Sequence, residues 1–524
     1  MQYPFLRLTI SFVLGTIAGS ITSNSVGQCL WLTLLLCLLI AGIGMMFIGS
    51  RATSKTSIFH SAIGFMAMFM LGGWNMALHI KDMTVSLPVQ QQEYKAIVAT
   101  VPEKHGKVMS ADIIISQGSL KGRKVKATLL ADETNCPQIG DGIVFISKMQ
   151  EPGQKIGNFN YHDYLLHHGY VAQTFITPDH LQYADIDITE ISHTDRLMIR
   201  ARKTREDINS KYLATPHNTG DDMTPIIAAL TLGDKSQLGK PLKEAYSISG
   251  GSHILALSGL HLGILYGLMV MLLGRRPRMW KQAIILFSIW SFVVLVGCSA
   301  SVVRSAVMLT IYTLLTLMRR SHLSLSTWAM TLFIILLANP WNLWDVGVQM
   351  SFMAVFAILV YGAPLQRVVN KHLEADFSDS PTWFSHMLKF TKPLMKWAWG
   401  MVAVSLAAQI GVAPLIAYYF HRVSLLFLLT NFLVVPCATV ILWLFVLSWP
   451  ASLSSFCHTL VMNIMYMVVK WMNEGVKWIA SLPVASWEGI DINGWQTMGI
   501  YAILFLPLFF HLPSLPRIVR DYRK

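Results

Sequence analysis

Residues 253–264 read His-Ile-Leu-Ala-Leu-Ser-Gly-Leu-His-Leu-Gly-Ile and lie inside an apolar run over residues 252–273. A run of about 20 apolar residues crosses the hydrocarbon core of a bilayer. Polar side chains at that depth face a protein interior or a water-filled path, because lipid cannot satisfy them. The stretch therefore predicts a membrane segment whose polar residues have a role of their own.

Three roles fit these polar residues. Ser258 and His261 are three positions apart and share one face of a continuous helix, with His253 within a quarter turn of that face. They can hold helices together or line a translocation path. They can also form the nucleophile and base of an intramembrane hydrolase. The hydrolase is the least favoured, because no third, orienting acid lies nearby in the sequence.

The whole chain has the composition of a membrane protein. Of its 524 residues, 53% are hydrophobic and only 13% are charged, whereas about a quarter of the residues in a soluble protein are charged. The net charge of +13 is typical of Lys- and Arg-rich cytoplasmic loops. Six cysteines are scattered without a Cys-x-x-Cys motif. We therefore expect no disulfide framework, no metal site and no cofactor.

Apolar runs predict about 12 spans, with both ends of the chain in the cytoplasm. The predicted spans cover residues 5–21, 29–48, 58–79, 252–273, 282–296, 302–317, 323–337, 346–360, 397–420, 425–447, 456–469 and 498–510. Loops with clusters of Lys and Arg alternate with loops that have few of these residues or are acidic, and this alternation sets the orientation. We expect the first run to be a retained helix rather than a signal peptide. The predicted fold is a polytopic α-helical membrane protein.

A different kind of sequence follows the third predicted span. Residues 81–190 contain no run that could span a membrane, and they form an extracytoplasmic domain in this topology. Short β-type runs at 95–101, 112–116, 124–130, 143–147 and 171–176 alternate with glycine-rich turns. This pattern predicts one small β barrel or sandwich inserted after the third span. The size suits an OB-like fold, although other small β folds remain open.

The predicted domains after the β domain are a connecting helix at 191–225, a membrane domain at 226–515 and a basic cytoplasmic tail at 516–524. The connecting helix, over residues 194–214, has a basic face that would rest on lipid headgroups or contact nucleic acid. In the membrane domain, Gly233 and Asp234 indicate a turn. Further polar positions recur in several predicted spans. They are Arg304, Asp345, Gln349 and Asn431. Together they favour a pore or a carrier over a passive anchor.

Several motifs in order resemble the ComEC family of competence proteins. They are Gly233-Asp234; His-Ile-Leu-Ala-Leu-Ser-Gly-Leu-His-Leu-Gly over 253–263; Gly-Cys-Ser-Ala-Ser over 297–301 with Arg304-Ser305-Ala306-Val307-Met308; Asn339-Pro340 with Asp-Val-Gly-Val-Gln-Met-Ser-Phe over 345–352; and Asn431 with Pro436. The β domain adds a looser match over 157–170. Larger family members carry a C-terminal metallo-β-lactamase-like domain. This sequence has no His-x-His-x-Asp-His, so we expect a short form without that domain or its metal.

The resemblance implies a channel in the bacterial inner membrane, and not an enzyme, that passes single-stranded DNA into the cytoplasm during transformation. The expected channel-lining residues are His253, Ser258, Gly259, His261, Arg304, Asp345, Gln349 and Asn431. The expected DNA-binding residues of the β domain are Lys121, Arg123, Lys124, Lys126, Phe159, Tyr161 and Tyr164. Those aromatics could equally be core.

Expected partners are single-stranded DNA, the lipid bilayer, a DNA-binding competence protein and a cytoplasmic nucleotide-driven motor, since this chain has no Gly-x-x-x-x-Gly-Lys-Ser/Thr loop. The sequence does not indicate the oligomeric state. A small-solute transporter and the serine hydrolase of Ser258 and His261 remain as alternatives.

Overall fold

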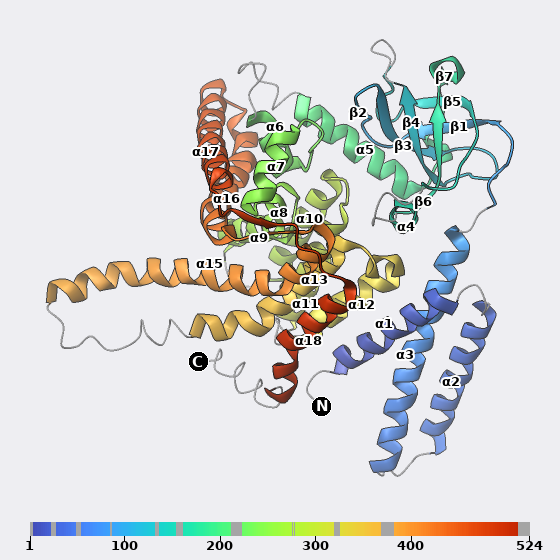
Figure 1. The fold of residues 1–524 in the computed structure, drawn as a ribbon, viewed down its shortest axis with the longest axis horizontal. Coiled ribbons are helices and arrows are strands. Elements are labelled where there is room, and N and C mark those ends of the chain that lie inside the picture. The colour runs from blue at the N-terminus through green and yellow to red at the C-terminus, as the bar shows by residue number, and fades with distance from the viewer. Residues whose placement is uncertain are drawn as a thin grey trace. The chain divides into compact units, whose positions relative to one another are not determined.

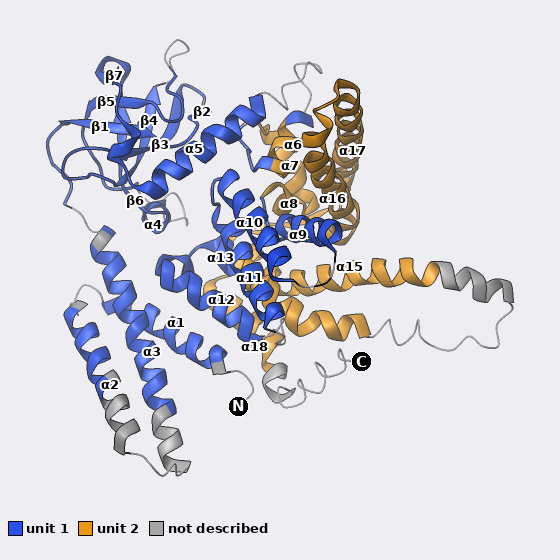
Figure 2. Cartoon of the chain, turned by 180° about the vertical axis from the view of Figure 1, so that it is seen from behind, with its two compact units in different colours: residues 1–224, 232–236, 257–349 blue, residues 225–231, 237–256, 350–524 orange. Residues whose placement is uncertain are grey.

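The computed structural model describes residues 4–22, 28–48, 54–83, 86–130, 136–153, 161–210, 223–274, 276, 278–318, 325–367 and 382–511. The chain divides into two compact units (Figure 2). Unit 1 contains residues 1–224, 232–236 and 257–349, and unit 2 contains residues 225–231, 237–256 and 350–524. Each unit is described by itself below.

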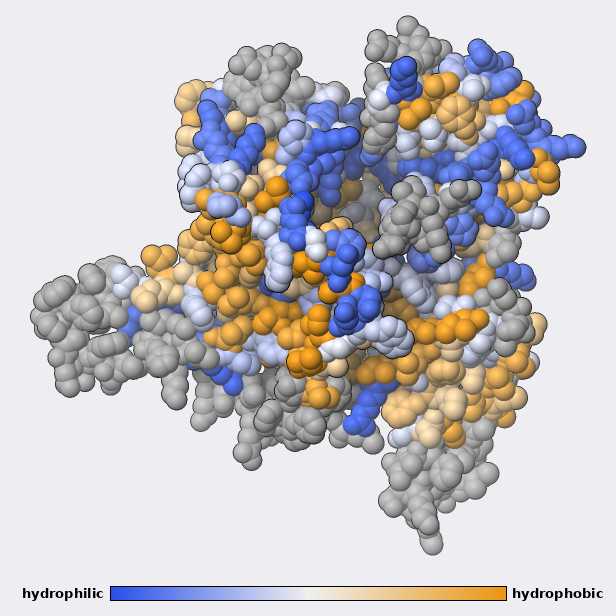
Figure 3. Space-filling view, in the orientation of Figure 1, coloured by the Kyte–Doolittle hydropathy of each residue, from blue (hydrophilic) through white to orange (hydrophobic). Residues whose placement is uncertain are grey.

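Unit 1 begins with three apolar helices, α1 (Pro4–Thr22), α2 (Gln28–Ile48) and α3 (Ser54–Met83). Helices α1 and α3 approach very closely, because a Cβ atom at Gly15 would clash with the backbone of Phe69, and one at Gly72 with the backbone of Phe12. Small residues permit this kind of backbone approach between membrane helices. The space-filling view shows hydrophobic residues gathered over these helices (Figure 3).

A small barrel follows, built from β1 (Gln92–Val98), β2 (Glu103–His105), β3 (Val108–Ile115), β4 (Lys124–Leu130), β5 (Gly142–Ser147), β6 (Tyr170–Ile176) and β7 (Leu181–Tyr183). The strand order is β6-β4-β3-β1-β5-β7, with β2 paired to β3. Only the β4–β6 pair is parallel among the paired strands described. Gln150, just after β5, bridges Gln173 in β6, so the sheet curls back on itself. Alternate residues such as Ile113, Ala127 and Phe145 fill its interior.

The five predicted β runs correspond to β1, β3, β4, β5 and β6, which confirms a small sheet domain after the third helix. The two strands that the sequence did not indicate, β2 and β7, have three residues each. Three shorter elements complete the domain. They are α4 (Tyr161–His167), η1 (Pro178–His180) and η2 (Ile188–Glu190). Helix α4 lies at the lower edge of the barrel in Figure 1.

The basic helix is α5 (His193–Ile208), and the last four residues of the predicted 194–214 lie outside the described part. Its apolar side packs on the outer surface of the barrel through Ile199, which is buried with Ile97 and Ile114. Arg202 donates to the carbonyl of Ala99 at 2.7 Å. Part of the basic face is therefore used inside the protein, and neither lipid headgroups nor nucleic acid reach that part.

The remainder of unit 1 is a helical block. It contains α9 (Gly259–Leu273), α10 (Met279–Leu295), α11 (Ala300–Leu317), α12 (Leu325–Ala338), η4 (Pro340–Leu343) and the first turn of α13 (Val346–Ala357). The first three helices share a core that includes Leu262, Ile289 and Ala306. Helix α12 also contacts α1, where the hydroxyl of Thr9 donates to the carbonyl of Ala329 at 3.1 Å.

Unit 2 is also mostly helical. Its elements are most of α6 (Met223–Leu232), α7 (Lys240–Ser249), α8 (Ser252–Leu255), the rest of α13, a π turn η5 (Ile358–Gly362), α15 (Thr382–Phe420), β8 (Arg422–Ser424), α16 (Phe427–Ala451), α17 (Ser455–Ser481), β9 (Ser486–Glu488) and α18 (Gly494–His511). Arg422 pairs with Glu244 at 2.7 Å and with Glu488 at 3.0 Å. These ion pairs join the β8–β9 ribbon to α7.

Six helices in the described part are long and apolar enough to cross a membrane. They are Phe5–Thr22, Ser61–Lys81, Ala300–Leu317, Val346–Arg367, Thr391–Phe420 and Phe427–Ala451. The protein is therefore a helical membrane protein with a small sheet domain. One predicted span is wrong as drawn, because the run 252–273 is broken between α8 and α9. The run 456–469 lies within the longer helix α17.

Candidate functional site

Helix α11 brings distant sequence motifs together at Arg304 and Ser305. On one side, Gly259 at the start of α9 lies so close that a Cβ atom there would be 2.8 Å from the hydroxyl of Ser305. On the other side, Nη2 of Arg304 donates to the carbonyl of Gly347 at 2.8 Å. The beginnings of α9 and α13 thus both contact α11. We call the residues Ser258, Gly259, Arg304, Ser305, Asp345 and Gly347 the motif cluster.

The sequence Ser258–His261 is the beginning of a helix rather than part of a continuous one. Ser258 has extended backbone angles and caps α9, and its hydroxyl accepts a bond from the backbone N–H of Leu260 at 3.3 Å. Nδ1 of His261 accepts from the backbone N–H of Ser258 at 3.2 Å. This reciprocal capping box satisfies helix N–H groups that would otherwise have no partner. Ser258 and His261 therefore do not share a face of one continuous helix, although the hydroxyl of Ser258 lies 3.3 Å from Nδ1 of His261.

Arg304 is a buried cation, with 5% of its surface exposed. Its Nη1 lies 3.9 Å from Oδ1 of Asp345, and neither Nε nor Nη1 has a hydrogen-bond partner among the described residues. An arginine inside a membrane protein costs several kcal/mol and is rarely retained for packing alone. The carbonyl of Gly347 and the carboxylate of Asp345 balance the charge, while two N–H groups keep donor capacity.

Asp345 connects this arginine to the helix that follows it. Its Oδ1 accepts from the backbone N–H of Val348 at 2.8 Å and so caps α13. Its Oδ2 lies 3.5 Å from Nε2 of His168, which comes from the barrel. Gln349 lies one turn beyond Asp345, with its backbone N–H on the carbonyl of Asp345 at 3.0 Å, and its side-chain amide donates to the carbonyl of Leu343 at 3.0 Å. Gln349 thereby stabilises the turn that precedes the helix.

Gly233 and Asp234 lie in a turn after α6. Gly233 has φ +74°, and a Cβ atom there would be 2.5 Å from the side chain of Leu257. Only glycine adopts this conformation beside that neighbour without strain. Asp234 accepts from the backbone N–H of Ser236 at 3.0 Å and from the amide of Asn209 at 2.9 Å. The turn thus packs directly before the Ser258 cap.

The other two expected channel residues belong to unit 2. His253 is exposed in α8, where its Nδ1 lies 3.0 Å from the carbonyl of Gly250. Asn431 donates to the hydroxyl of Ser405 at 3.2 Å, and its Oδ1 is buried without a hydrogen-bond partner in the described part of the chain. These two residues are therefore not members of the motif cluster.

On the barrel, the expected DNA-binding residues are placed in two groups, and Phe159 lies outside the described residues. Lys121 and Arg123 lie in the turn between β3 and β4, and Lys124 and Lys126 lie on β4. Lys126 is not a free cation, because its ammonium pairs with Asp112 at 2.8 Å.

Tyr170 also donates to Asp112, at 2.8 Å. Burial, followed by the charge of Asp112, raises the pKa of the Tyr170 phenol well above its usual range. The phenol is therefore protonated at any physiological pH and keeps donating to the carboxylate.

The second group of barrel residues lies on α4. Tyr161 and Tyr164 stack with ring centroids 6.0 Å apart, and Tyr164 lies 4.2 Å from the ring of His168. His167, on the same helix, stacks on Trp341 of η4 at 4.7 Å. The sequence reasoning missed both histidines, although the His167-His168 pair directly precedes the Gly169-Tyr170 motif and would have been a usable signal.

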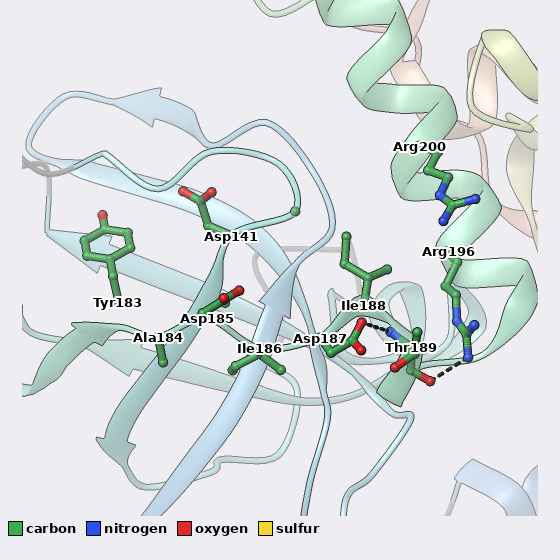
Figure 4. A pocket seen from close by; sticks show the side chains of 12 residues that line it. Asp141, Tyr183, Ala184, Asp185, Ile186, Asp187, Ile188, Thr189, Arg196 and Arg200 are labelled. Carbon is green, nitrogen blue, oxygen red and sulfur yellow. Dashed lines mark hydrogen bonds between the residues drawn. The ribbon is translucent and has the colours of Figure 1, made fainter.

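A pocket on the barrel lies away from all of these residues (Figure 4). Residues after β7, among them Asp185 and Asp187, face Arg196 and Arg200 of α5 across it. Arg196 donates to the carbonyl of Thr189, and Asp187 accepts from the backbone N–H of the same residue. These contacts fix the loop before α5, and none of the expected site residues lines the pocket.

The chain resembles known competence proteins over much of its length. The model of the family described as "Competence protein" matches residues 230–513. The chain is 25% identical to ComE operon protein 3 of Bacillus subtilis over 402 residues, which cover 75% of this chain and 47% of that protein. It is 30% identical to Competence protein ComA of Neisseria gonorrhoeae over 145 residues, covering 26% and 21% of the two chains. The chain thus spans less than half the length of these relatives. No solved structure matches.

Proposed function

Because the chain belongs to the competence protein family, we propose that it is an inner-membrane channel that passes single-stranded DNA into the cytoplasm during natural transformation. The observation that carries this proposal is the motif cluster. Three helix beginnings, of α9, α11 and α13, meet around a buried arginine with unused donors. Broken helices and retained charge inside a membrane protein are typical of a transport path.

The channel lining follows from this arrangement. We assign Ser258, Gly259, His261, Arg304, Asp345 and Gln349, all in unit 1, to the walls of the path; for His253 and Asn431 of unit 2 this role stays a prediction from the sequence. In this assignment Ser258 and His261 shape the wall by capping α9, and the protein is not an enzyme. Arg304 would offer passing phosphates a weak, exchangeable contact, which conduction requires.

The barrel is proposed to be OB-like. Its five main strands, β1, β3, β4, β5 and β6, lie in the sheet in the order fifth, third, second, first, fourth. The third and fifth are parallel, and a bridge between the residue Gln150 after the fourth strand and the fifth strand brings the two ends of the sheet together. An OB fold is a five-stranded Greek-key barrel that binds oligonucleotides on strands two and three and on the loops 1–2 and 4–5. Here Lys124 and Lys126 lie on the third strand, and α4 lies in the loop between the fourth and fifth.

The remaining assignments rest on the sequence pattern and on the family. We propose an orientation with both termini in the cytoplasm, about 12 spans, and cooperation with a DNA-binding competence protein and a nucleotide-driven motor. The proposed domains are 1–80, 81–190, 191–225, 226–515 and 516–524. None of these is needed for the test below.

The test replaces the buried cation in a transformable host that carries this chain as its only copy. Arg304→Ala is expected to lower the transformation frequency and the amount of labelled DNA that becomes resistant to external nuclease, while an immunoblot finds the protein in the membrane. Arg278→Ala, at the exposed start of α10, is the matched control and retains uptake. Normal uptake in Arg304→Ala would remove Arg304 from the path. Substrate-dependent uptake of a small solute with normal transformation would favour a solute transporter.

A further inference from the structure

A series of aromatic rings leads from the barrel to the beginning of α13. On α4, the ring centroids of Tyr161 and Tyr164 are 6.0 Å apart at an interplanar angle of 16°, and those of Tyr164 and His168 are 4.2 Å apart. The residues are three and four positions apart, so they share one helix face. Helix α4 therefore presents a ladder of rings rather than a single aromatic side chain.

The series continues across η4, which precedes Asp345. His167 lies 4.7 Å from Trp341 and 6.1 Å from Trp344, and the two tryptophans are 5.9 Å apart. At the end of α4, the ring of His168 reaches Asp345 through Nε2 at 3.5 Å. We call Tyr161, Tyr164, His167, His168, Trp341 and Trp344 the aromatic track.

The aromatic track lies at the protein surface and not in a core. Tyr164 is 42% exposed, and the other rings are half-buried or exposed. The aromatic pair inside the barrel, Tyr94 and Phe145, is instead 4% and 1% exposed. Rings that only filled a core would resemble that pair. The exposed parts of these rings are available to a ligand.

The charges along the track indicate which part of a nucleic acid it contacts. Asp163 and Asp345 border it, and the cation whose charge acts on Tyr164 is Lys126, which is already paired with Asp112 at 2.8 Å. Carboxylates repel phosphates, so the favourable contact is with the bases. Burial raises the pKa of Tyr164 and lowers that of His167, so both rings are neutral near pH 7.

We propose that the aromatic track binds the unpaired bases of a single strand by stacking, without sequence preference, and guides them from the barrel toward the motif cluster. This proposal rests on the proposed function. It identifies the bases as the part of the DNA that α4 of the barrel and the turn η4 recognise. Stacking suits a moving strand, because every base has a π-face and each contact is equivalent to the next.

The test measures binding of two labelled oligonucleotides to the full chain in nanodiscs of uncharged lipid. One is an oligothymidylate of about 16 nucleotides, the upper site size of an OB fold, and the other is an abasic strand of the same length. The oligothymidylate is expected to bind at least about tenfold more tightly than the abasic strand, because the stacking of a single base accounts for about that difference in affinity. Tyr164→Ala and Trp341→Ala reduce oligothymidylate binding and leave abasic binding unchanged, and Trp341→Phe retains both.

The matched control is Tyr183→Ala, another exposed tyrosine on β7 of the barrel. It leaves the difference between the two oligonucleotides unchanged. Equal binding of the abasic strand and the oligothymidylate would overturn the track. So would a Trp341→Phe protein that binds as weakly as Trp341→Ala, because a stacking role tolerates another aromatic ring.

The outcome separates this inference from the proposed function. If Arg304→Ala loses DNA uptake while both oligonucleotides bind equally, the channel stands and the aromatic track is wrong. If binding depends on the bases while Arg304→Ala takes up DNA normally, the track stands and the channel path through the motif cluster is wrong.

Discussion

Replacing Ser258 decides between a helix cap and a nucleophile. In the structure Ser258 accepts one bond from Leu260 N–H, and its own N–H donates to His261, at 3.3 and 3.2 Å. Loss of a Ser cap costs about 1 kcal/mol, which changes an equilibrium about fivefold. Ser258→Ala should therefore reduce DNA uptake by about fivefold at most. Loss of a catalytic nucleophile reduces activity on the order of 10⁴-fold or more.

The decisive comparison uses residues that cap helices but cannot replace a serine nucleophile. Asn and Asp are as good at the N-cap as Ser, so Ser258→Asn and Ser258→Asp should restore uptake to the wild-type level. The assay is transformation frequency at matched membrane protein levels, together with the thermal midpoint of the purified protein. If Ser258→Asn and Ser258→Ala both lower DNA uptake by thousands-fold, the capping assignment is refuted.

Three further predictions concern packing, pH and the barrel. Gly259→Ala should destabilise the protein by about 1–3 kcal/mol, because its Cβ would meet Ser305, and Ser305→Gly in the same chain should recover part of the thermal midpoint. Because burial lowers the pKa of His167, the unfolded chain binds the proton more readily. Stability should therefore be constant above about pH 6.5, the ordinary histidine value, and fall below it, and His167→Phe should flatten that slope. Tyr170→Phe should cost about 1–2 kcal/mol in thermal unfolding by removing one of the bonds to Asp112; an unchanged midpoint would contradict that bond.

The sequence predicted the small sheet domain and its five main strands, because alternating apolar residues and glycine turns are local signals. The helix break at 256–258 was not predictable in the same way. Serine and glycine occur within continuous membrane helices as well as at their ends, so hydropathy alone predicts one unbroken span over 252–273. The cap formed by His261 depends on that break.

The aromatic track shows a second limit. Tyr161 and Tyr164 were predicted as DNA-binding residues, and their stacking follows from helix spacing. The contact of His167 with Trp341 joins positions 174 residues apart by numbering, and no local pattern reports it. Arg304 and Asp345 were singled out because charge is costly in a membrane, and that reasoning needs no tertiary structure.

Helix α5 has a mechanical consequence. It is fixed to the barrel by Ile199 and Arg202, and Arg205 near its other end lies against the carbonyl of Val296 after α10, at 3.4 Å. The barrel has a second attachment to the helical block through His167 and Trp341. His168 adds a further contact with Asp345 of that block. The barrel is therefore held at several separate places within unit 1, and shortening α5 would remove the Arg205 contact while leaving the ring contacts in place.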